Sequence, residues 1–462
     1  MQPFARNIHK QPTTSQQLFE YDACSSIAPI AGKKVGIAFD GGSITSDAGF
    51  LLLRETEAQS NIISKLTPCL SDPRRIPSVK HSLGDLMTQR VYQIATGYED
   101  GIDSNALSKD PALKMALARL PESGTDLASQ PTISRLENMV TRTELYRMGQ
   151  VFVDHFISSY TEQPSVIILD CDDTASVTYG HQQMALFSGH YQEKCYQPLH
   201  IYEGLSGKLI STILRPGKRP SGKEILAYIK RLVPRIRSQW PDTIMVYRGD
   251  SHYGVPEVFT YLSQQQNCYS ITGLSRNDVL VEKIKPFLKE AAHQAVGYKR
   301  YYSFMYQAAS WSKPRRVVAK IEITQKEGLN IRFISTDMLA ANTTKLYETI
   351  YCARGNDELY IKDHKTYTKS DRTSCHSFTA NQFRLFLHSA AYVLLHAFRA
   401  NMLKGTELAT ATFATIRMKL LKIGARVIEQ KRKIKVQLPT AYPYKTILTK
   451  CLALFESLRM ST

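Results

Sequence analysis

A run of apolar residues that leads into a cluster of acids constrains the fold of this 462-residue chain most strongly. Val166-Ile-Ile-Leu169 is continuously apolar and is followed by Asp170-Cys-Asp172-Asp173-Thr174. Such a run predicts a central strand that is buried on both faces of its sheet. Thr243-Ile-Met-Val-Tyr247 repeats the pattern and leads into Arg248-Gly-Asp250. Open α/β sheets bind ligands beyond their strand ends, so acids at these two positions are well placed for a site.

The segments around these two strands predict an α/β core. Pro198–Glu203 and Lys208–Leu214 are typical of a β-hairpin, and a helix is expected from Ser221 to about Trp240. Residues 268–272, 315–323 and 330–336 are expected to be further strands. A strand, a hairpin, a helix and a strand, with acids ending the first and the last, resemble the layout of a ribonuclease H-like domain.

The N-terminal part predicts a mainly helical region. Ser82 with Asp85, and Thr141 with Glu144, form capping-box patterns, and Asp110-Pro111 marks another helix start. Lys34–Phe39 and Ala48–Leu53 are predicted strands. Helices of this size with basic residues between them suit a DNA-binding module, although an ordinary helical subdomain has the same pattern.

Together with what the family resemblance described below implies, these patterns predict six regions. They are a polar arm (1–33), a mainly helical DNA-binding region (34–160), the first part of the ribonuclease H-like core (161–272), a β-rich insertion (273–341), a catalytic helix with the end of the core (342–403), and a basic C-terminal region (404–462). In the last region Ile434, Val436 and Leu438 alternate with polar residues, so a strand there would expose its cations on one face. Such a face is either a solvated surface or a DNA contact.

The formal net charge of +18 indicates a polyanionic partner, with nucleic acid as the first candidate. The most apolar run, Leu385–Phe398, is too short and too polar to span a bilayer, so no membrane partner is expected. Eight cysteines without a C-x-x-C pair fit reduced thiols in a bacterial cytoplasm.

The stretch from Tyr351 to Lys365 carries a second arrangement of charges. On an α-helix, with about 100° per residue, Tyr351, Arg354, Glu358 and Lys365 project from one narrow stripe. A carboxylate between two cations suits a metal ion with phosphate beside it, whereas spaced ion pairs on an exposed helix are the simpler alternative.

Tyr-x2-Arg-x3-Glu-x6-Lys resembles the YREK signature of DDE transposases from bacterial insertion sequences. Further stretches resemble the insertion sequence 1380 family within the insertion sequence 4 group. They are Phe39–Phe50, Leu169–Thr174, Leu214–Glu224 and Arg248–Gly254.

The resemblance implies that Asp172, Asp250 and Glu358 are the catalytic acids and hold Mg²⁺, for which Mn²⁺ is expected to substitute. Asp170 stays open as an alternative first acid. Tyr351, Arg354 and Lys365 are expected to grip the transposon end. The implied enzyme cleaves terminal inverted repeats and joins them to target DNA, as a homodimer in a synaptic complex associated with the bacterial nucleoid.

The cations Arg215, Lys218, Arg219 and Lys223 around Pro216-Gly217 predict a loop that grips phosphate, with a plain charged turn as the alternative. Two other functions also stay open. One is a metal-dependent DNA nuclease on the same fold that does not join strands, and the other is a non-catalytic DNA-binding regulator.

Overall fold

A mixed eight-stranded sheet is the largest sheet in the computed structural model, which describes residues 23–75, 77 and 79–461. Its order is β12-β13-β14-β11-β10-β4-β8-β9. The bounds are β4 (Val166–Asp173), β8 (Leu199–Glu203), β9 (Leu209–Ile213), β10 (Ile244–Gly249), β11 (Cys268–Leu274), β12 (Lys299–Tyr306), β13 (Arg315–Thr324) and β14 (Gly328–Thr336). β4 pairs in parallel with β10 and antiparallel with β8. Residues 167–171 are buried, which confirms the predicted central strand.

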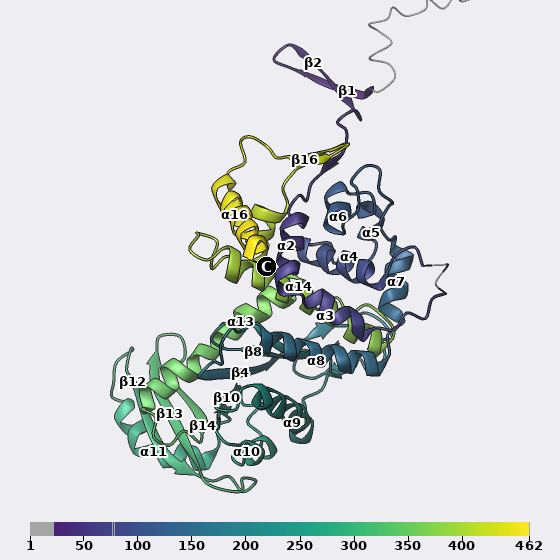
Figure 1. Cartoon of the computed structure of the whole chain (residues 1–462). Coiled ribbons are helices and arrows are strands. Elements are labelled where there is room, and N and C mark those ends of the chain that lie inside the picture. The colour runs from purple at the N-terminus through teal and green to yellow at the C-terminus, as the bar shows by residue number, and fades with distance from the viewer. Residues whose placement is uncertain (1–22, 76, 78, 462) are drawn as a thin grey trace, which may run out of the picture.

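Helices cover both faces of this sheet (Figure 1). On one face, apolar residues of β4 and β10 pack against α8 (Arg142–Ser158), α9 (Gly222–Gln239) and α10 (Pro256–Leu262). α11 (Asp278–Ala291) packs on β13 and β14. The opposite face, with Ile168 and Val246, packs against Leu346 and Tyr347 from the segment that leads to the predicted catalytic helix. Alternate residues of β4 therefore point to two different environments.

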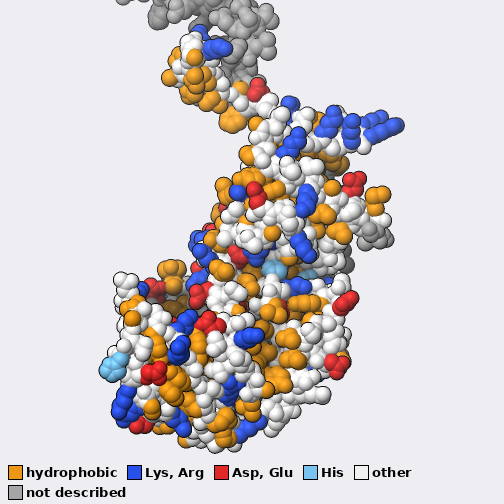
Figure 2. All heavy atoms as spheres, turned by 90° about the vertical axis from the view of Figure 1, so that its left-hand side faces the viewer, with side chains coloured by type: hydrophobic (Ala, Val, Ile, Leu, Met, Phe, Trp, Pro, Cys, Tyr) orange, Lys and Arg blue, Asp and Glu red, His pale blue; other side chains and the backbone are white. Residues whose placement is uncertain are grey.

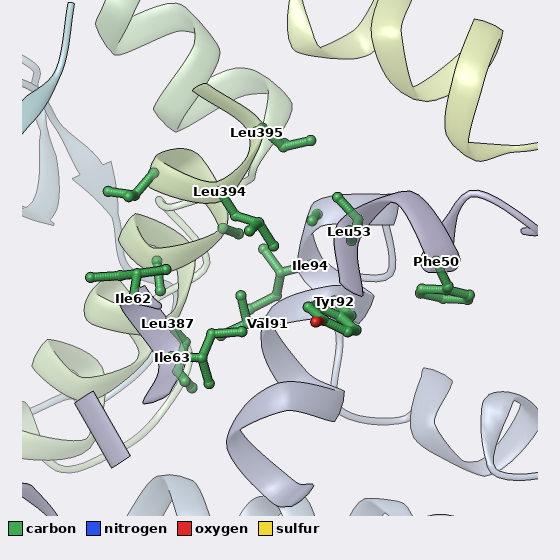
Figure 3. Packing of buried hydrophobic residues seen from close by; sticks show 14 of the residues in the cluster. Phe50, Leu53, Ile62, Ile63, Val91, Tyr92, Ile94, Leu387, Leu394 and Leu395 are labelled. Carbon is green, nitrogen blue, oxygen red and sulfur yellow. The ribbon is translucent and has the colours of Figure 1, made fainter. Parts of the chain in front are cut away.

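A second, mainly helical part of the molecule is built around α14 (Phe378–Ala397), whose side chains are almost all buried. Figure 3 shows residues of α2, α3 and α4 packed against Leu387, Leu394 and Leu395 of α14. The remaining helices of the N-terminal and C-terminal regions are α2 (Phe50–Ser60), α3 (Ile62–Leu66), α4 (Leu83–Thr96), α5 (Asp103–Leu107), α6 (Pro111–Ala116), α7 (Gln130–Asn138), α15 (Phe413–Ile416) and α16 (Lys445–Ser461). Both ends of the chain thus contribute to one apolar core.

The described residues also form three smaller sheets. β1 (Ala23–Ile30) and β2 (Lys33–Ala38) form a hairpin that projects from the body (Figure 1). β5 (Ser176–Val177), β6 (Leu186–Ser188) and β7 (Glu193–Tyr196) form the second sheet. The third has the order β16-β15-β3, with bounds β3 (Ile44–Thr45), β15 (Ala425–Gln430) and β16 (Lys433–Gln437).

The local capping signals are confirmed. Ser82 and Thr141 accept hydrogen bonds from the backbone N–H of Asp85 and Glu144, and both capping boxes are complete. Asp110 caps α6 in the same way, with Pro111 in the first turn. These residues satisfy N–H groups that the first helical turn leaves without an intrahelical partner.

Two expectations about local structure are wrong. Ala48–Leu53 is not a strand, because α2 begins at Phe50 and buries Phe50, Leu52 and Leu53 in the helical core. The polar arm does not extend to residue 33, because Ala23–Ile30 is a strand; the rest of that predicted arm, residues 1–22, lies outside the described residues.

The strands of the expected β-rich insertion extend the main sheet. β14 pairs with β11, and β13 and β12 follow outward. β12, β13 and β14 therefore belong to the same hydrogen-bonded sheet as β10 and β4. Among the described helices, none is both long enough and apolar enough to cross a bilayer.

Candidate active site

Asp172 and Asp250 lie side by side at the ends of neighbouring parallel strands. The register of β4 and β10 pairs Asp170 with Arg248 and Cys171 with Gly249, and the next residue on each chain is an acid. The side chain of Asp172 is 18% exposed and that of Asp250 is 33% exposed, so both reach solvent. Two of the three predicted catalytic acids are thus brought together by backbone pairing.

The Asp172 carboxyl lies where a negative charge is unfavourable. Burial raises its pKa to about 7, and the charges of Asp250 and Asp173 act in the same direction. The guanidinium of Arg354 opposes this shift, with Nη1 at 3.1 Å from Asp172 Oδ2. A cation shared between Asp172 and Asp250 would relieve the same repulsion.

Asp170 points to the same face of β4 as Asp172 but is completely buried. Both of its oxygens accept hydrogen bonds from the guanidinium of Arg248, which also donates to the carbonyl of Ile350. Asp357 of α13 (Gly355–Ile361) is buried against this pair, and burial, followed by the charge of Asp170, raises the pKa of Asp357. Asp170 therefore ties β4, β10 and the signature segment together.

Asp173 points to the opposite face, as the alternation of a strand predicts. It accepts a hydrogen bond from the hydroxyl of Tyr253 at 3.2 Å and forms an ion pair with Arg215 at 3.5 Å. Burial raises the pKa of the Asp173 carboxyl, and Arg215 opposes that shift.

The signature segment is helical, but the expectation of one uninterrupted α-helix is wrong. A π-helical segment (Leu346–Tyr351) and a 3₁₀ turn (Cys352–Arg354) precede α13, and a second π-helical segment (Lys362–Tyr367) follows it. Changes of pitch re-aim the side chains relative to a regular helix and are frequent at functional sites.

Three of the four signature side chains face the acidic strand ends. Arg354 contacts Asp172, and Nζ of Lys365 donates to Thr174 Oγ1 at 3.1 Å and to the carbonyl of Ala175. Tyr351 lines the hollow that contains Asp250 and Arg354. These three side chains therefore share one side of the signature segment, the side toward the ends of β4 and β10.

Glu358 is placed differently. It is exposed on α13, while its neighbour Asp357 takes the inward position. Within the described residues, no three His, Cys, Asp or Glu side chains are grouped closely enough to hold a metal ion. Asp172 and Asp250 offer neighbouring carboxylate oxygens, the ligand type that divalent cations such as Mg²⁺ prefer. Glu358 would have to turn toward this pair to become a third ligand.

A hollow of about 420 Å³ opens beside Asp250. Its wall includes Tyr347 and Tyr351, and its cationic residues come from β13, β14, the loop after β11 and the signature segment. They are Arg276, Lys320, Arg332 and Arg354. Lys320 is paired with Glu322 at 2.6 Å, whereas neither Arg276 nor Arg332 forms an ion pair with another described residue. The hollow can hold an anionic group next to the acids.

The fold places the four cations of the predicted phosphate-gripping loop in two different environments. Arg215 is buried, and its guanidinium contacts Asp173, Glu224 and the carbonyl of Lys218. Lys218, Arg219 and Lys223 are exposed. Arg215 thus shapes the loop from inside, and the other three cations are presented to solvent.

Arg248, Asp357, Arg276 and Arg332 were not among the residues predicted from the sequence. Arg248 carried a usable signal, because an arginine that directly follows a predicted buried strand needs a carboxylate partner if it is buried as well. Asp357 had no such signal, since its inward position depends on the irregular pitch before α13. Arg276 and Arg332 come together only through the β11–β14 pairing.

The transposase DDE domain group 1 family matches residues 27–460. Among solved structures, the chain is similar to piggyBac transposase in its synaptic complex with hairpin DNA, with a TM-score of 0.45 and 13% identity over 82% of this chain and 80% of that chain. No relative was found among curated proteins.

The family match covers most of the sequence, and the chain belongs to the transposase DDE domain group 1 family. The protein is accordingly a DDE transposase, an enzyme that acts in DNA transposition.

Proposed function

We propose that Asp172, Asp250 and Glu358 are the catalytic acids of this transposase and that the core is of the ribonuclease H-like kind. The observation that carries the proposal is the pairing of β4 with β10, which sets Asp172 beside Asp250 at an open strand end. Asp170 is the weaker candidate for first acid, because both its oxygens are occupied by buried Arg248.

Asp172 and Asp250 would hold a divalent metal, for which we propose Mg²⁺, with Mn²⁺ able to replace it. When bound, such an ion neutralises phosphodiester charge and lowers the pKa of a water nucleophile. Oxygen ligands of this kind suit hard cations. Glu358 would complete the set if it turned inward from its exposed position on α13.

The chain's cations orient the DNA around these acids. Arg354 and Lys365 already lie at the strand ends, so each can exchange its present partner for a phosphate oxygen of the transposon end. Tyr351 with Arg276 and Arg332 lines the hollow that would hold the neighbouring nucleotide. Lys218 and Arg219, on the loop that Arg215 braces, and Lys223, in the first turn of α9, extend the contact along the DNA backbone.

The substrate we infer is double-stranded DNA: the terminal inverted repeats of an insertion sequence, and a target into which the freed ends are joined. The YREK spacing supports placing the enzyme in the insertion sequence 1380 family of the insertion sequence 4 group. A homodimer would synapse two ends, and the enzyme would work at the bacterial nucleoid. The helical region over 34–160 would take part in binding DNA.

Single-turnover cleavage of the element's own ends tests the proposal. Asp172→Asn and Asp250→Asn should lower the rate by several orders of magnitude while DNA binding is kept, because charge is removed at nearly constant size. Glu358→Gln should behave in the same way, and Glu456→Gln, at an exposed acid of α16, is the control. Cleavage by Asp172→Asn at the parental rate would refute the assignment. Recovery of joined products separates a transposase from a nuclease.

A further inference from the structure

The hairpin formed by β15 and β16 carries cations on one face. Its register pairs Arg426 with Gln437, Ile428 with Lys435, and Gln430 with Lys433. Since alternate residues of a strand share a face, Arg426, Lys433 and Lys435 project from the same side. Lys431 and Arg432 form the turn at the tip. All five cations are exposed, and together they are called the basic hairpin face below.

The opposite face of the hairpin is anchored to the body. Val427 is buried, Ala425 belongs to the helical core, and Val436 packs against that core. Glu429 accepts hydrogen bonds from the backbone N–H of Glu122 and Ser123 and from the Ser123 hydroxyl. β15 also pairs with β3. The basic hairpin face is therefore held in one orientation, not carried on a loose loop.

The charge of this face is not balanced within the described part of the chain. None of its five cations forms an ion pair with a described acid, in contrast to Arg90, Arg248 and Arg399 of the interior. Figure 2 shows Lys and Arg side chains gathered on a projection of the upper body, at the height of β16 in Figure 1. A rigid row of unpaired cations suits a polyanion.

We propose that the basic hairpin face binds the sugar-phosphate backbone of duplex DNA at a site separate from the acidic strand ends. This inference rests on the proposed function, in which DNA is the substrate. The rest of the face consists of Gln430, Gln437 and half-buried Ile428. It has no aromatic ring for base stacking and no apolar anchor for a lipid surface. The contact is therefore sequence-independent and acts through phosphate.

The position of the basic hairpin face indicates what its contact with DNA does. β16 lies at the far side of the helical part from β4 and β10 (Figure 1). DNA that reaches from the strand ends to the hairpin must pass the helical part, so the basic hairpin face holds a portion remote from the scissile phosphate. It should raise affinity without changing the rate of cleavage once DNA is bound.

The test is the variant Lys433→Gln/Lys435→Gln, titrated with duplex DNA of arbitrary sequence at several salt concentrations. Loss of two phosphate contacts should reduce the slope of log K against log salt by about 1.8. The control Lys289→Gln/Lys326→Gln removes the same charge from exposed lysines of α11 and the β13–β14 turn, and its slope should stay parental. Lys433→Arg/Lys435→Arg should restore binding, and Lys431→Gln/Arg432→Gln is a second variant at the tip.

An unchanged slope in both neutralised variants, or an equal loss in the control, would overturn the inference; acid-rich protein would then be the partner to examine. Single-turnover cleavage at saturating protein separates this outcome from failure of the proposed function. If the parent cleaves DNA while the slope of the Gln variants is unchanged, only the hairpin contact is refuted. If the parent neither binds nor cleaves DNA, both proposals fall.

Discussion

Asp172 is balanced between groups that favour its neutral form and groups that favour its charge. Burial and Asp250 raise its pKa to about 7, whereas Arg354 lowers it. Metal ligation requires the ionised carboxylate, so a proton and a metal compete for Asp172 near neutral pH. The rate of metal-dependent cleavage should therefore rise as the pH passes through about 7.

Replacing Arg354 by Gln should move this pH profile. Without the guanidinium, the pKa of Asp172 rises further, and the midpoint of cleavage rate against pH should shift upward. The plateau rate should fall by roughly 10- to 150-fold, equivalent to about 1.5–3 kcal/mol for a lost charge-assisted contact to phosphate. Lys365→Gln is the matched control, because Lys365 contacts Thr174 and Ala175. Its plateau should fall with the midpoint unmoved; a parental midpoint in Arg354→Gln would contradict the argument.

The buried pair Asp170–Arg248 is expected to hold the site together without taking part in chemistry. Both side chains have no exposed area, so Arg248→Met leaves an uncompensated buried carboxylate and should cost about 3–5 kcal/mol of unfolding free energy. Asp170→Leu/Arg248→Met should recover most of that loss, since an apolar pair avoids desolvation of two charges. Urea unfolding measures both variants. Cleavage by the double variant would also exclude Asp170 as the first acid, whereas a stable but inactive double variant would favour it.

At the scale of helices and strands, features that depend on residues close together in the sequence were predicted. Features that depend on contacts between distant segments were missed. The capping boxes of α4 and α8 join residues three positions apart, and sequence reasoning found both. The strand ends at Asp172 and Asp250 follow from apolar runs, so their common edge was also predictable. α2 was missed because Phe50, Leu52 and Leu53 are buried by α14 and other distant segments, and a short apolar run does not distinguish helix from strand.

The signature segment shows where sequence reasoning stopped. A constant 100° per residue gave the right face for Arg354 and Lys365, but not the two π-helical segments or the 3₁₀ turn around α13. Those changes of pitch depend on contacts with β4 and β10, such as the bond from Arg248 to the carbonyl of Ile350. The choice between Asp357 and Glu358 as the inward residue therefore could not be read from spacing alone.

A buried acid at the corner between α2 and α3 predicts how the free energy of unfolding depends on pH. Glu57 is buried there and accepts hydrogen bonds from the N–H groups of Ile63 and Ser64, yet burial raises its pKa from 4.5 to about 7. Because the folded state holds the proton more tightly, its stabilising contribution is complete below pH 4.5 and is lost as the pH rises to about 7.

Glu57→Gln should remove this dependence, since glutamine resembles the protonated acid. The parental free energy of unfolding should fall by up to about 1.4 kcal/mol per pH unit through that window, and the variant should lack this component. Denaturant unfolding at a series of pH values measures it. Glu456→Gln, at an exposed acid of α16, should keep the parental slope. Parallel curves for parent and Glu57→Gln would show that burial does not control this carboxyl.

At the scale of the whole molecule, three separated regions carry cations without described acid partners and are proposed as DNA contacts. They are the hollow beside Asp250 (Arg276 and Arg332), the loop braced by Arg215 (Lys218, Arg219 and Lys223), and the basic hairpin face. Arg90, Arg248 and Arg399 of the interior, in contrast, are paired with acids. These ten cations are exposed, so a long polyanion can reach all three regions.

DNA affinity should consequently depend steeply on salt. If each region neutralises about two phosphates, roughly six counterions are released and the slope of log K against log salt should be about −5. Neutralising one region at a time should remove its own share, because contacts that are far apart and share no partner add nearly independently. Titration of duplex DNA from low to physiological salt, with the parent and with one Gln variant for each region, measures the shares. A nearly flat parental slope would refute phosphate-driven binding as a whole. A steep slope that only one region reduces would instead confine the DNA to that region.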